Sequence, residues 1–263
     1  MKLCEIVDHI ENIAPLSIAA PWDNSGMQVA SVNDSVSHIG VMLDPTPTMI
    51  ATAIAAGADM ILSHHPLLMQ PKMPNTPDEY HAVLRLLLQR DIPLYSAHTS
   101  LDANLRGPAG WLANALGLTS RRTLECVAEH EKGEPHYGFG IVGNLPAPLS
   151  YATFTDALAA TLGKPAWRAS GPMPASVSRV AYCPGSGESM IRAAAANGAD
   201  VYVTGDIKYH AALETPIRVL DVGHFILEEI MTRGFADLLR EALSPVTVTF
   251  FNAADPFTFE GAA

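Results

Sequence analysis

The sequence predicts an α/β fold made of two facing, similar lobes with mainly parallel sheets. Two observations lead to this prediction. Short apolar runs alternate with segments of helical periodicity along most of the 263 residues, and one helix-turn-strand unit occurs twice. Strands that alternate with helices are typical of parallel sheets, because a parallel neighbour is reached through a long crossover that is usually a helix.

The individual elements follow from local pattern. Helices are expected where apolar residues recur at helical spacing. In chain order these segments are 3–14, 48–56, 81–89, 110–116, 151–162, 190–196 and 225–242. Strands are expected in short apolar runs, at 38–43, 60–63, 92–97, 138–142, 180–183, 201–204, 218–222 and 246–251. The first helix ends at Pro15, because proline lacks the N–H that a helix interior needs.

An internal repeat supports the two lobes. Residues 49–59 align without a gap on 190–200, at an offset of 141 residues, and both segments end in Gly-Ala-Asp before an expected strand. Chance similarity between alanine-rich helices is the alternative. We predict one lobe from residues 1–125 with 218–263, which would bind metal, and a second lobe from residues 126–217.

Composition narrows the class of protein. Apolar residues make up 48% of the chain and charged residues 16%, as in globular proteins. The net charge of −11 opposes binding to nucleic acid or to anionic membranes. The cysteines at 4, 126 and 183 are too scattered for a disulfide framework or a zinc–thiolate site, which fits a reducing cytosol. We expect a cytoplasmic protein without signal peptide or membrane span.

Polar side chains follow the ends of the expected strands. Ligands of open parallel sheets bind at the carboxyl ends of strands. The residues found there are Asp44, His64, His65, His98, Asp206 and His224. Pro66 favours a loop directly after His65, so these adjacent histidines can serve one site. The alternative for the pair is two partly buried histidines bonded to the backbone.

Two histidine–carboxylate pairs add to this group. His98 and Asp102 are four residues apart, as are His224 and Glu228, and such pairs share a face of a helical turn. Imidazole with carboxylate suits zinc, iron, manganese or nickel. Only a carboxylate readily bridges two metals, which makes Asp102 or Glu228 the expected bridge. The predicted two-metal cluster consists of His64, His65, Asp102, His224 and Glu228.

Several nearby residues have no role that spacing assigns. Asp206 could cap a helix or orient a metal-bound histidine. His210 and Lys208 are close in sequence to Asp206, and their roles stay open. Asp23, which follows Trp22, is expected in a buried turn.

These motifs resemble the NIF3-like family, whose members are also called GTP cyclohydrolase 1 type 2 homologs. The matching segments are 21–26, 63–66, 96–102, 138–143, 185–187, 199–206 and 222–224, with Glu228. The resemblance runs nearly end to end and implies a short form without an inserted middle domain. It implies two divalent metal ions per chain on the five ligands named above, with His98 close by, and a toroidal homohexamer whose sites face the central cavity. The stretch 106–111 departs from the family pattern.

The resemblance also implies a metal-dependent hydrolase that opens the guanine ring of GTP and releases formate. A metal-activated water would attack C8, and His98 or Glu228 would move protons. A metal-dependent phosphoesterase or nuclease is one alternative, and a non-catalytic metal-binding ring that acts as a scaffold is another. The sequence leaves open the native metal, the true substrate and any binding of nucleic acid.

Overall fold

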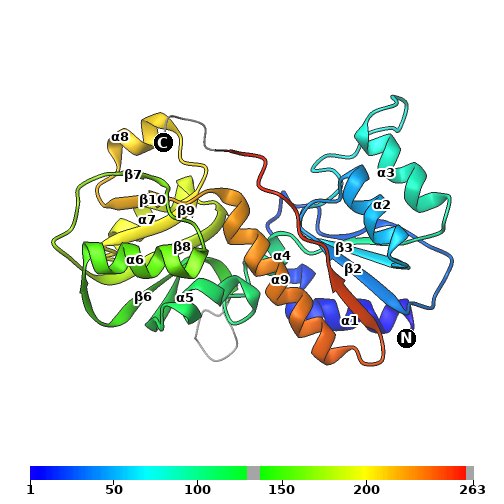
Figure 1. The fold of residues 1–263 in the computed structure, drawn as a ribbon, viewed down its shortest axis with the longest axis horizontal. Coiled ribbons are helices and arrows are strands. Elements are labelled where there is room, and N and C mark those ends of the chain that lie inside the picture. Colours follow the sequence, from blue (N-terminus) through cyan, green and yellow to red (C-terminus); the bar gives the residue numbers. More distant parts are fainter. Residues whose placement is uncertain (129–136, 259–263) are drawn as a thin grey trace.

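The computed structural model describes residues 1–128 and 137–258. Two lobes lie side by side, and one long helix runs between them (Figure 1). The helices are α1 (Leu3–Ile13), α2 (Pro47–Ala55), α3 (Glu79–Leu88), α4 (Thr99–Asp102), α5 (Trp111–Ala115), α6 (Tyr151–Leu162), α7 (Ile191–Ala196), α8 (Tyr209–Glu214) and α9 (His224–Ala242).

The first lobe is built on a five-stranded sheet of order β1-β4-β3-β2-β11. Its strands are β1 (Gly26–Val29), β2 (His38–Met42), β3 (Met60–Ser63), β4 (Leu94–Ser96) and β11 (Thr247–Phe250). All neighbours pair in parallel except β1, which is antiparallel to β4. Val41 packs with α1 and α9 on one face, and Met42 packs with α2 and α3 on the other. Helices therefore cover both faces, as a parallel sheet requires.

The second lobe is built on a six-stranded sheet of order β5-β6-β8-β9-β10-β7. Its strands are β5 (Thr119–Ala128), β6 (Tyr137–Ser150), β7 (Arg168–Ser170), β8 (Ser176–Ser186), β9 (Val201–Gly205) and β10 (Arg218–Asp221). The central strands β8, β9 and β10 are parallel, and the flanking pairs are antiparallel. Helices α5 and α6 cover one face, and α7 and α8 cover the other.

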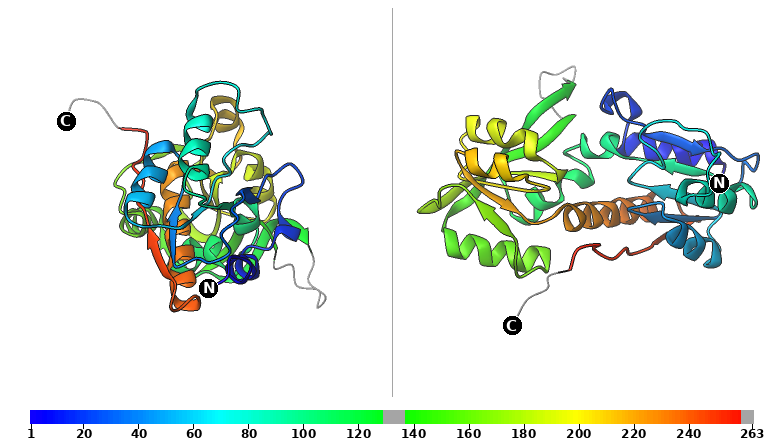
Figure 2. Two further views of the ribbon diagram at one scale, coloured as in Figure 1. Left: turned by 90° about the vertical axis from the view of Figure 1, so that its right-hand side faces the viewer. Right: turned by 90° about the horizontal axis from the view of Figure 1, so that it is seen from above.

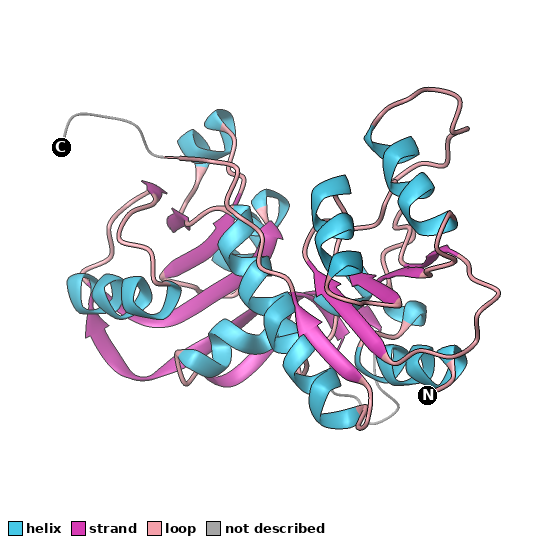
Figure 3. Cartoon of the chain, turned by 45° about the vertical axis from the view of Figure 1, so that its right-hand side comes forward, coloured by secondary structure: helices cyan, strands magenta, loops and turns pink. Residues whose placement is uncertain are grey.

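Helix α9 joins the two lobes. It contacts β2 and β11 of the first sheet and β8 and β9 of the second. Met231 and Phe235 pack into the core of the first lobe, whereas Leu227, nearer the start of the helix, packs into that of the second. The sheets lie on either side of this helix (Figure 3). The first turns of α9 therefore lie where the strand ends of both lobes meet.

The internal repeat is confirmed in three dimensions. Ile39 pairs with Met60, and at the same offset of 141 Val180 pairs with Val201. The Asp59 carboxylate accepts hydrogen bonds from the N–H groups of residues 37 and 38. The Asp200 carboxylate accepts from those of residues 178 and 179. The two units therefore share register and turn chemistry.

The expected α/β fold with two similar lobes is confirmed, and three strands were not predicted: β1, β5 and β7. Helix α5 and strands β5 and β10 belong with the second lobe, whereas boundaries at 125 and 218 would place them in the first. Hydrophobic periodicity finds elements, but it does not say which sheet a strand joins. Within the described residues, no helix is both long and apolar enough to cross a membrane.

Candidate metal centre

Histidines and carboxylates of both lobes meet at the start of α9. His64 and His65 follow β3, and His98 follows β4 directly before α4. Asp102 ends α4, while His224 opens α9 one turn before Glu228. Gly223 precedes α9 with a φ of +93°. Glycine adopts such a backbone readily, so it lets the chain turn directly from the strand region into the helix.

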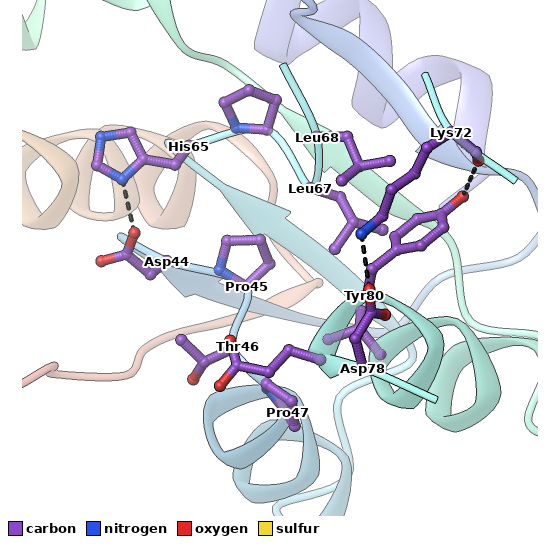
Figure 4. A pocket seen from close by; sticks show the side chains of 13 residues that line it. Asp44, Pro45, Thr46, Pro47, His65, Leu67, Leu68, Lys72, Asp78 and Tyr80 are labelled. Carbon is purple, nitrogen blue, oxygen red and sulfur yellow. Dashed lines mark hydrogen bonds and ion pairs between the residues drawn. The ribbon is translucent and has the colours of Figure 1, made fainter. Parts of the chain in front are cut away.

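The two adjacent histidines are held in different ways. His64 is buried, and its Nδ1 lies 2.8 Å from the carbonyl oxygen of Ala97. Its Nδ1 therefore carries the hydrogen and donates it, which directs Nε2 into the cluster. The Nδ1 of His65 lies 2.7 Å from Oδ1 of Asp44 (Figure 4). The Nε2 of His65 lies 3.0 Å from Oε2 of Glu228.

The other two histidines repeat this arrangement. Nδ1 of His98 lies 2.7 Å from Oδ1 of Asp23, and Nδ1 of His224 lies 2.8 Å from Oδ2 of Asp206. Nε2 of His224 lies 2.7 Å from Oε2 of Glu228. A carboxylate or carbonyl on the outer nitrogen fixes the ring and its tautomer, as is usual for histidines that bind metals.

The carboxylates at the centre are buried and incompletely paired. The side chain of Glu228 is 4% exposed and that of Asp102 is 14% exposed. Nε2 of His64 lies 3.7 Å from Oδ1 of Asp102 and 3.7 Å from Oε1 of Glu228, too far for a hydrogen bond. Both Nε2 of His64 and Oδ1 of Asp102 are buried without a hydrogen-bond partner. Such groups are costly unless something binds them.

The electrostatics of the cluster favour positive charge. Burial lowers the pKa of His65, but Asp44 and Glu228 outweigh burial and raise that pKa to about 10. Burial likewise opposes the protonated form of His224, yet Glu228 and Asp206 raise its pKa to about 9. Burial raises the pKa of Asp102, and the same effect on Glu228 is outweighed by its histidines, so that the pKa of Glu228 lies well below its ordinary value.

The ligand atoms fit divalent metal ions. His64, Asp102 and Glu228 form one group, and His65, His224 and Glu228 form another, with ligand atoms within 4.8 Å of one another in each. Two ligand atoms on one tetrahedral zinc ion are about 3.4 Å apart, close to the separations given above. Oε1 of Glu228 faces His64, and Oε2 faces His65 and His224. Glu228 is therefore placed to bridge the two groups.

His98 offers an additional nitrogen. A third group that could hold a metal combines His64, His65 and His98. The ring centroids of His64 and His98 are 5.3 Å apart, and those of His65 and His98 are 5.5 Å apart. His98 thus borders the cluster beside His64 and His65, the histidines of the first lobe.

The structure brings all six sequence-predicted site residues together. Among the residues it describes, Lys208 and His210 are exposed and belong to none of the metal-ligating groups. Asp206, whose role was open, lies beside His224. The stretch 106–111 is packed against α9, where Nε1 of Trp111 donates to the carbonyl of Leu227.

Two kinds of residue were missed as parts of the site. Asp23 is the first: it accepts from His98, Ser25 and Thr99. Burial raises the pKa of Asp23, but these hydrogen bonds outweigh burial and hold it well below the ordinary value. Glycines are the second. A Cβ at Gly185 would lie 2.1 Å from Oε1 of Glu228, and one at Gly205 would lie 2.5 Å from the backbone N of His224.

Comparisons with known proteins agree with this arrangement. The model of the Duf34/NIF3 (NGG1p interacting factor 3) family matches residues 1–256. A relative from Clostridium perfringens named "GTP cyclohydrolase 1 type 2 homolog" is 30% identical over 266 residues, covering 98% of this chain and 100% of the relative. A protein of the same name from Methanocaldococcus jannaschii is 30% identical over 251 residues, covering 92% and 96%.

Solved structures share the fold over the whole chain. Protein SA1388 of Staphylococcus aureus matches with a TM-score of 0.87 and 25% identity, covering 99% of each chain. Reduced HcgD from Methanocaldococcus jannaschii matches with a TM-score of 0.81 and 29% identity, covering 95% of this chain and 97% of that one. The two-lobed architecture is therefore common to these proteins.

Proposed function

The chain belongs to the Duf34/NIF3 (NGG1p interacting factor 3) family, and from this premise we propose that it is a dinuclear metal-dependent hydrolase. Its reaction would be that named by its relatives, hydrolysis of the purine ring of GTP. One observation carries the proposal: His64, His65 and His224 have fixed outer nitrogens and direct their Nε2 atoms toward the carboxylates of Asp102 and Glu228.

We assign the ligands as two groups that share Glu228. His64 and Asp102 would hold one divalent cation with Oε1 of Glu228, and His65 and His224 would hold the second with Oε2. The unpaired Nε2 of His64 and Oδ1 of Asp102 support the first group. Zinc, iron, manganese and nickel all suit this mixture of imidazole and carboxylate.

Divalent cations held there would polarise the substrate and lower the pKa of a water molecule. In the proposed reaction, water adds to C8 of the purine and the C8–N9 bond opens. A second water then releases C8 as formate. Glu228 stays ionised between its imidazoles, which makes it a ligand rather than a proton donor. His98 is the better proton carrier, because Asp23 occupies its Nδ1 and leaves Nε2 to exchange protons with the substrate.

We also propose that six chains assemble into a ring with the metal centres on its inner side. Trp22 supports an interface near the centre: it is 60% exposed, and its ring centroid lies 6.1 Å from that of His98. Light scattering after size-exclusion chromatography measures the mass of the assembly. A mass of one or two chains would reject the ring without affecting the assignment of ligands.

The test of the metal centre and the reaction compares wild type with Glu228→Gln. Metal content is measured by mass spectrometry, and formate release is measured with GTP. We expect about two metals per chain and metal-dependent formate release in the wild type, and loss of both in the variant. Glu229→Gln is the matched control, because it removes a neighbouring buried carboxylate of α9 that belongs to none of the ligand groups found in the described residues.

The outcomes separate the parts of the proposal. Two metals without formate release would keep the centre and reject ring hydrolysis, which would favour a scaffold or a different substrate. A wild-type protein that takes up no metal would reject the dinuclear centre itself.

A further inference from the structure

A cavity of about 650 Å³ lies beside the metal centre, between the lobes. His65 and His224, the proposed ligands of one cation, both line it. Its size is within the range of sites for small organic molecules. Most of the remaining wall comes from the second lobe and from residues 255–258. A molecule bound there would lie directly against the proposed reaction centre.

Aromatic side chains supply apolar wall to this cavity. Trp167 follows α6, is half-buried and packs against the core of the second lobe. Phe225 comes from the first turn of α9. Flat aromatic faces suit a planar ring, which can stack on them. The cavity therefore has a surface for the base of a nucleotide.

The outer wall of the cavity is held in place by polar contacts. The N–H of Ala253 donates to Glu229 over 2.9 Å, and farther along the chain Asp255 lies 3.6 Å from Nζ of Lys164. The segment that carries these contacts runs alongside α9 from the first lobe toward the second (Figure 2). It therefore brings Phe257 to the cavity as part of the folded structure.

The charges around the cavity are balanced before any metal binds. Among the described residues, four carboxylates line it, and each is paired with a basic side chain. Asp44 and Asp206 hold the two histidines, and the other two carboxylates pair with Arg168 and Lys164. Two divalent cations would add positive charge beside this wall. The cavity therefore attracts phosphate groups, although the chain as a whole carries a net charge of −11.

Arg168 is held in the wall with most of its side chain accessible. It begins β7, the edge strand of the second sheet, directly opposite Asp221 of β10. Its Nη2 donates to Asp221, whose carboxylate also accepts from the N–H groups of residues 207 and 223. The side chain of Asp221 is 7% exposed, whereas that of Arg168 is 72% exposed. A buried carboxylate therefore fixes one end of an accessible guanidinium group.

The rest of this guanidinium group can serve a ligand. A guanidinium carries N–H donors on all three of its nitrogens. Within the described chain, every side-chain hydrogen bond of Arg168 comes from Nη2. The N–H groups of Nε and Nη1 can therefore donate to phosphate oxygens while Nη2 stays on Asp221.

The position of Arg168 suits a ligand that also reaches the metal centre. Its partner Asp221 precedes His224 by three residues, so the Cα atoms of these two residues are at most about 11 Å apart. Arg168 and His224 line the same cavity. One nucleotide can therefore place its phosphates on Arg168 and its base beside the cation proposed at His65 and His224.

We propose that the cavity between the lobes binds a purine nucleotide, with its phosphates on Arg168 and its base against Trp167. Arg168 then distinguishes a nucleotide from a nucleoside, and Asp221 is the positioning residue that holds it. This inference rests on the proposed function, because it assigns residues to the substrate of that reaction. It gives phosphate recognition to the second lobe, whose strand ends supply none of the proposed metal ligands.

The test is calorimetric titration of zinc-loaded protein, cleared of unbound zinc, with GTP and guanosine. We expect the wild type to bind GTP more tightly than guanosine. Arg168→Ala should weaken GTP binding about 10-fold or more, as loss of a charged hydrogen-bond partner does, and leave guanosine binding unchanged. Arg168→Lys should restore part of the loss, because lysine keeps the charge but lacks the planar fork.

The stacking surface is tested in the same way. Trp167→Ala should weaken binding of GTP and guanosine alike, about 10-fold or more, because both carry the base. Arg192→Ala and Tyr209→Ala are the matched controls, and both should bind the two ligands as the wild type does. Arg192 is an exposed arginine of α7 and Tyr209 an exposed aromatic of α8, and neither lines the cavity.

Unchanged GTP binding in Arg168→Ala would overturn this inference. Arg168→Lys can still pair with Asp221, so equal weakening of GTP and guanosine binding in both Arg168 variants would also overturn it. Formate release is measured separately. If Arg168→Ala released formate from GTP with the KM of the wild type, the assignment of Arg168 would be rejected and the reaction kept. The expected binding pattern without formate release would keep the cavity as the nucleotide site and reject the reaction.

Discussion

The two lobes have the same central pattern but different strand ends. In the first lobe Asp44, His64 and His65 follow the parallel strands, and at the offset of 141 the second lobe has Gly185, Gly205 and Asp206. The first lobe thus supplies imidazoles, whereas the second supplies two glycines and one carboxylate. Similar backbones can therefore serve one site in different ways. The strand ends of the first lobe supply proposed metal ligands, and those of the second lobe leave space for α9.

The room made by the glycines is occupied by α9. Its first turns carry His224 and Glu228, and both lie against the glycine positions of the second lobe. Had the second lobe kept a side chain at Gly185, the carboxylate of Glu228 would be displaced from the histidines of the first lobe. The asymmetry of the lobes is what allows one helix to complete the cluster.

The largest expected effect comes from placing a side chain at Gly185. In Gly185→Ala, the new Cβ would lie 2.1 Å from Oε1 of Glu228. Glu228 must then move, and because it belongs to both proposed ligand groups, we expect loss of both metals. Metal content by mass spectrometry and the melting temperature by calorimetry measure the effect.

Gly163→Ala is the matched control for backbone strain. Gly163 and Gly185 share a φ of +62°, but nothing lies within 4 Å of a Cβ at Gly163. The left-handed backbone costs a residue with a side chain roughly 1–2 kcal/mol, so both variants lose stability. Only Gly185→Ala should lose metal, and equal metal loss in both would mean that strain, not displacement of Glu228, is responsible.

A smaller effect is expected from the carboxylate that each lobe contributes as an orienting group. Asp44 of the first lobe and Asp206 of the second hold the rings of His65 and His224. Asp44→Asn and Asp206→Asn should each weaken binding of one of the two metals by about 10- to 100-fold, the usual cost of losing such a partner. Competition with a chelating dye measures both affinities.

The exposed Asp237, which pairs with Arg240 away from the cluster, provides the control in Asp237→Asn. A similar loss of metal affinity in Asp44→Asn and Asp206→Asn would show that both lobes orient a histidine equally well, although only the first lobe supplies imidazole ligands from its strand ends. Unchanged metal affinity in Asp206→Asn alone would mean that the second lobe contributes to the site only through the space that Gly185 and Gly205 leave for α9.

Much of this comparison was accessible from sequence. Ligands such as His64 and Glu228 stand out because few residue types bind metals, and strand ends converge in an α/β fold. Gly185 and Gly205 lie in segments that match the family, but their role could not be assigned from sequence, since the need for glycine arises from contacts with a distant helix. Asp23 was missed for the same reason: its partner, His98, is 75 residues away. Sheet membership of β5 and β10 also depended on pairing that periodicity does not encode.

A further prediction concerns Asp23 of the first lobe, whose carboxylate holds the ring of His98. Asp23→Asn leaves His98 without its charged partner, so we expect turnover to fall about 10-fold or more while metal content stays at two. Because the pKa of Asp23 is held below its ordinary value, its stabilising contribution is present above about pH 4 and is lost as pH falls further. The difference in melting temperature between wild type and variant should therefore narrow in acid.

Asp34→Asn, a change of an exposed aspartate in the same lobe, is the control for both measurements. Loss of one metal in Asp23→Asn would identify His98 as a ligand instead of a proton carrier. A melting-temperature difference that does not change with pH would contradict the ionised state assigned to Asp23.

The smallest expected effect compares His65 of the first lobe with His224 at the start of α9. In metal-free protein their pKa values are raised to about 10 and about 9, above the value of about 6.5 in unfolded chains. Their stabilising contribution is therefore complete below about pH 6.5 and is lost as pH rises through 9 and 10. The melting temperature of the metal-free protein should fall between pH 7 and 10, and that of the metal-loaded protein should fall less, because its cations replace the protons.

Nuclear magnetic resonance of the metal-free protein should show that His224 loses its proton at a lower pH than His65. The reverse order would mean that Asp206 holds its histidine more strongly than Asp44 does, and that the second lobe is the better orienting partner.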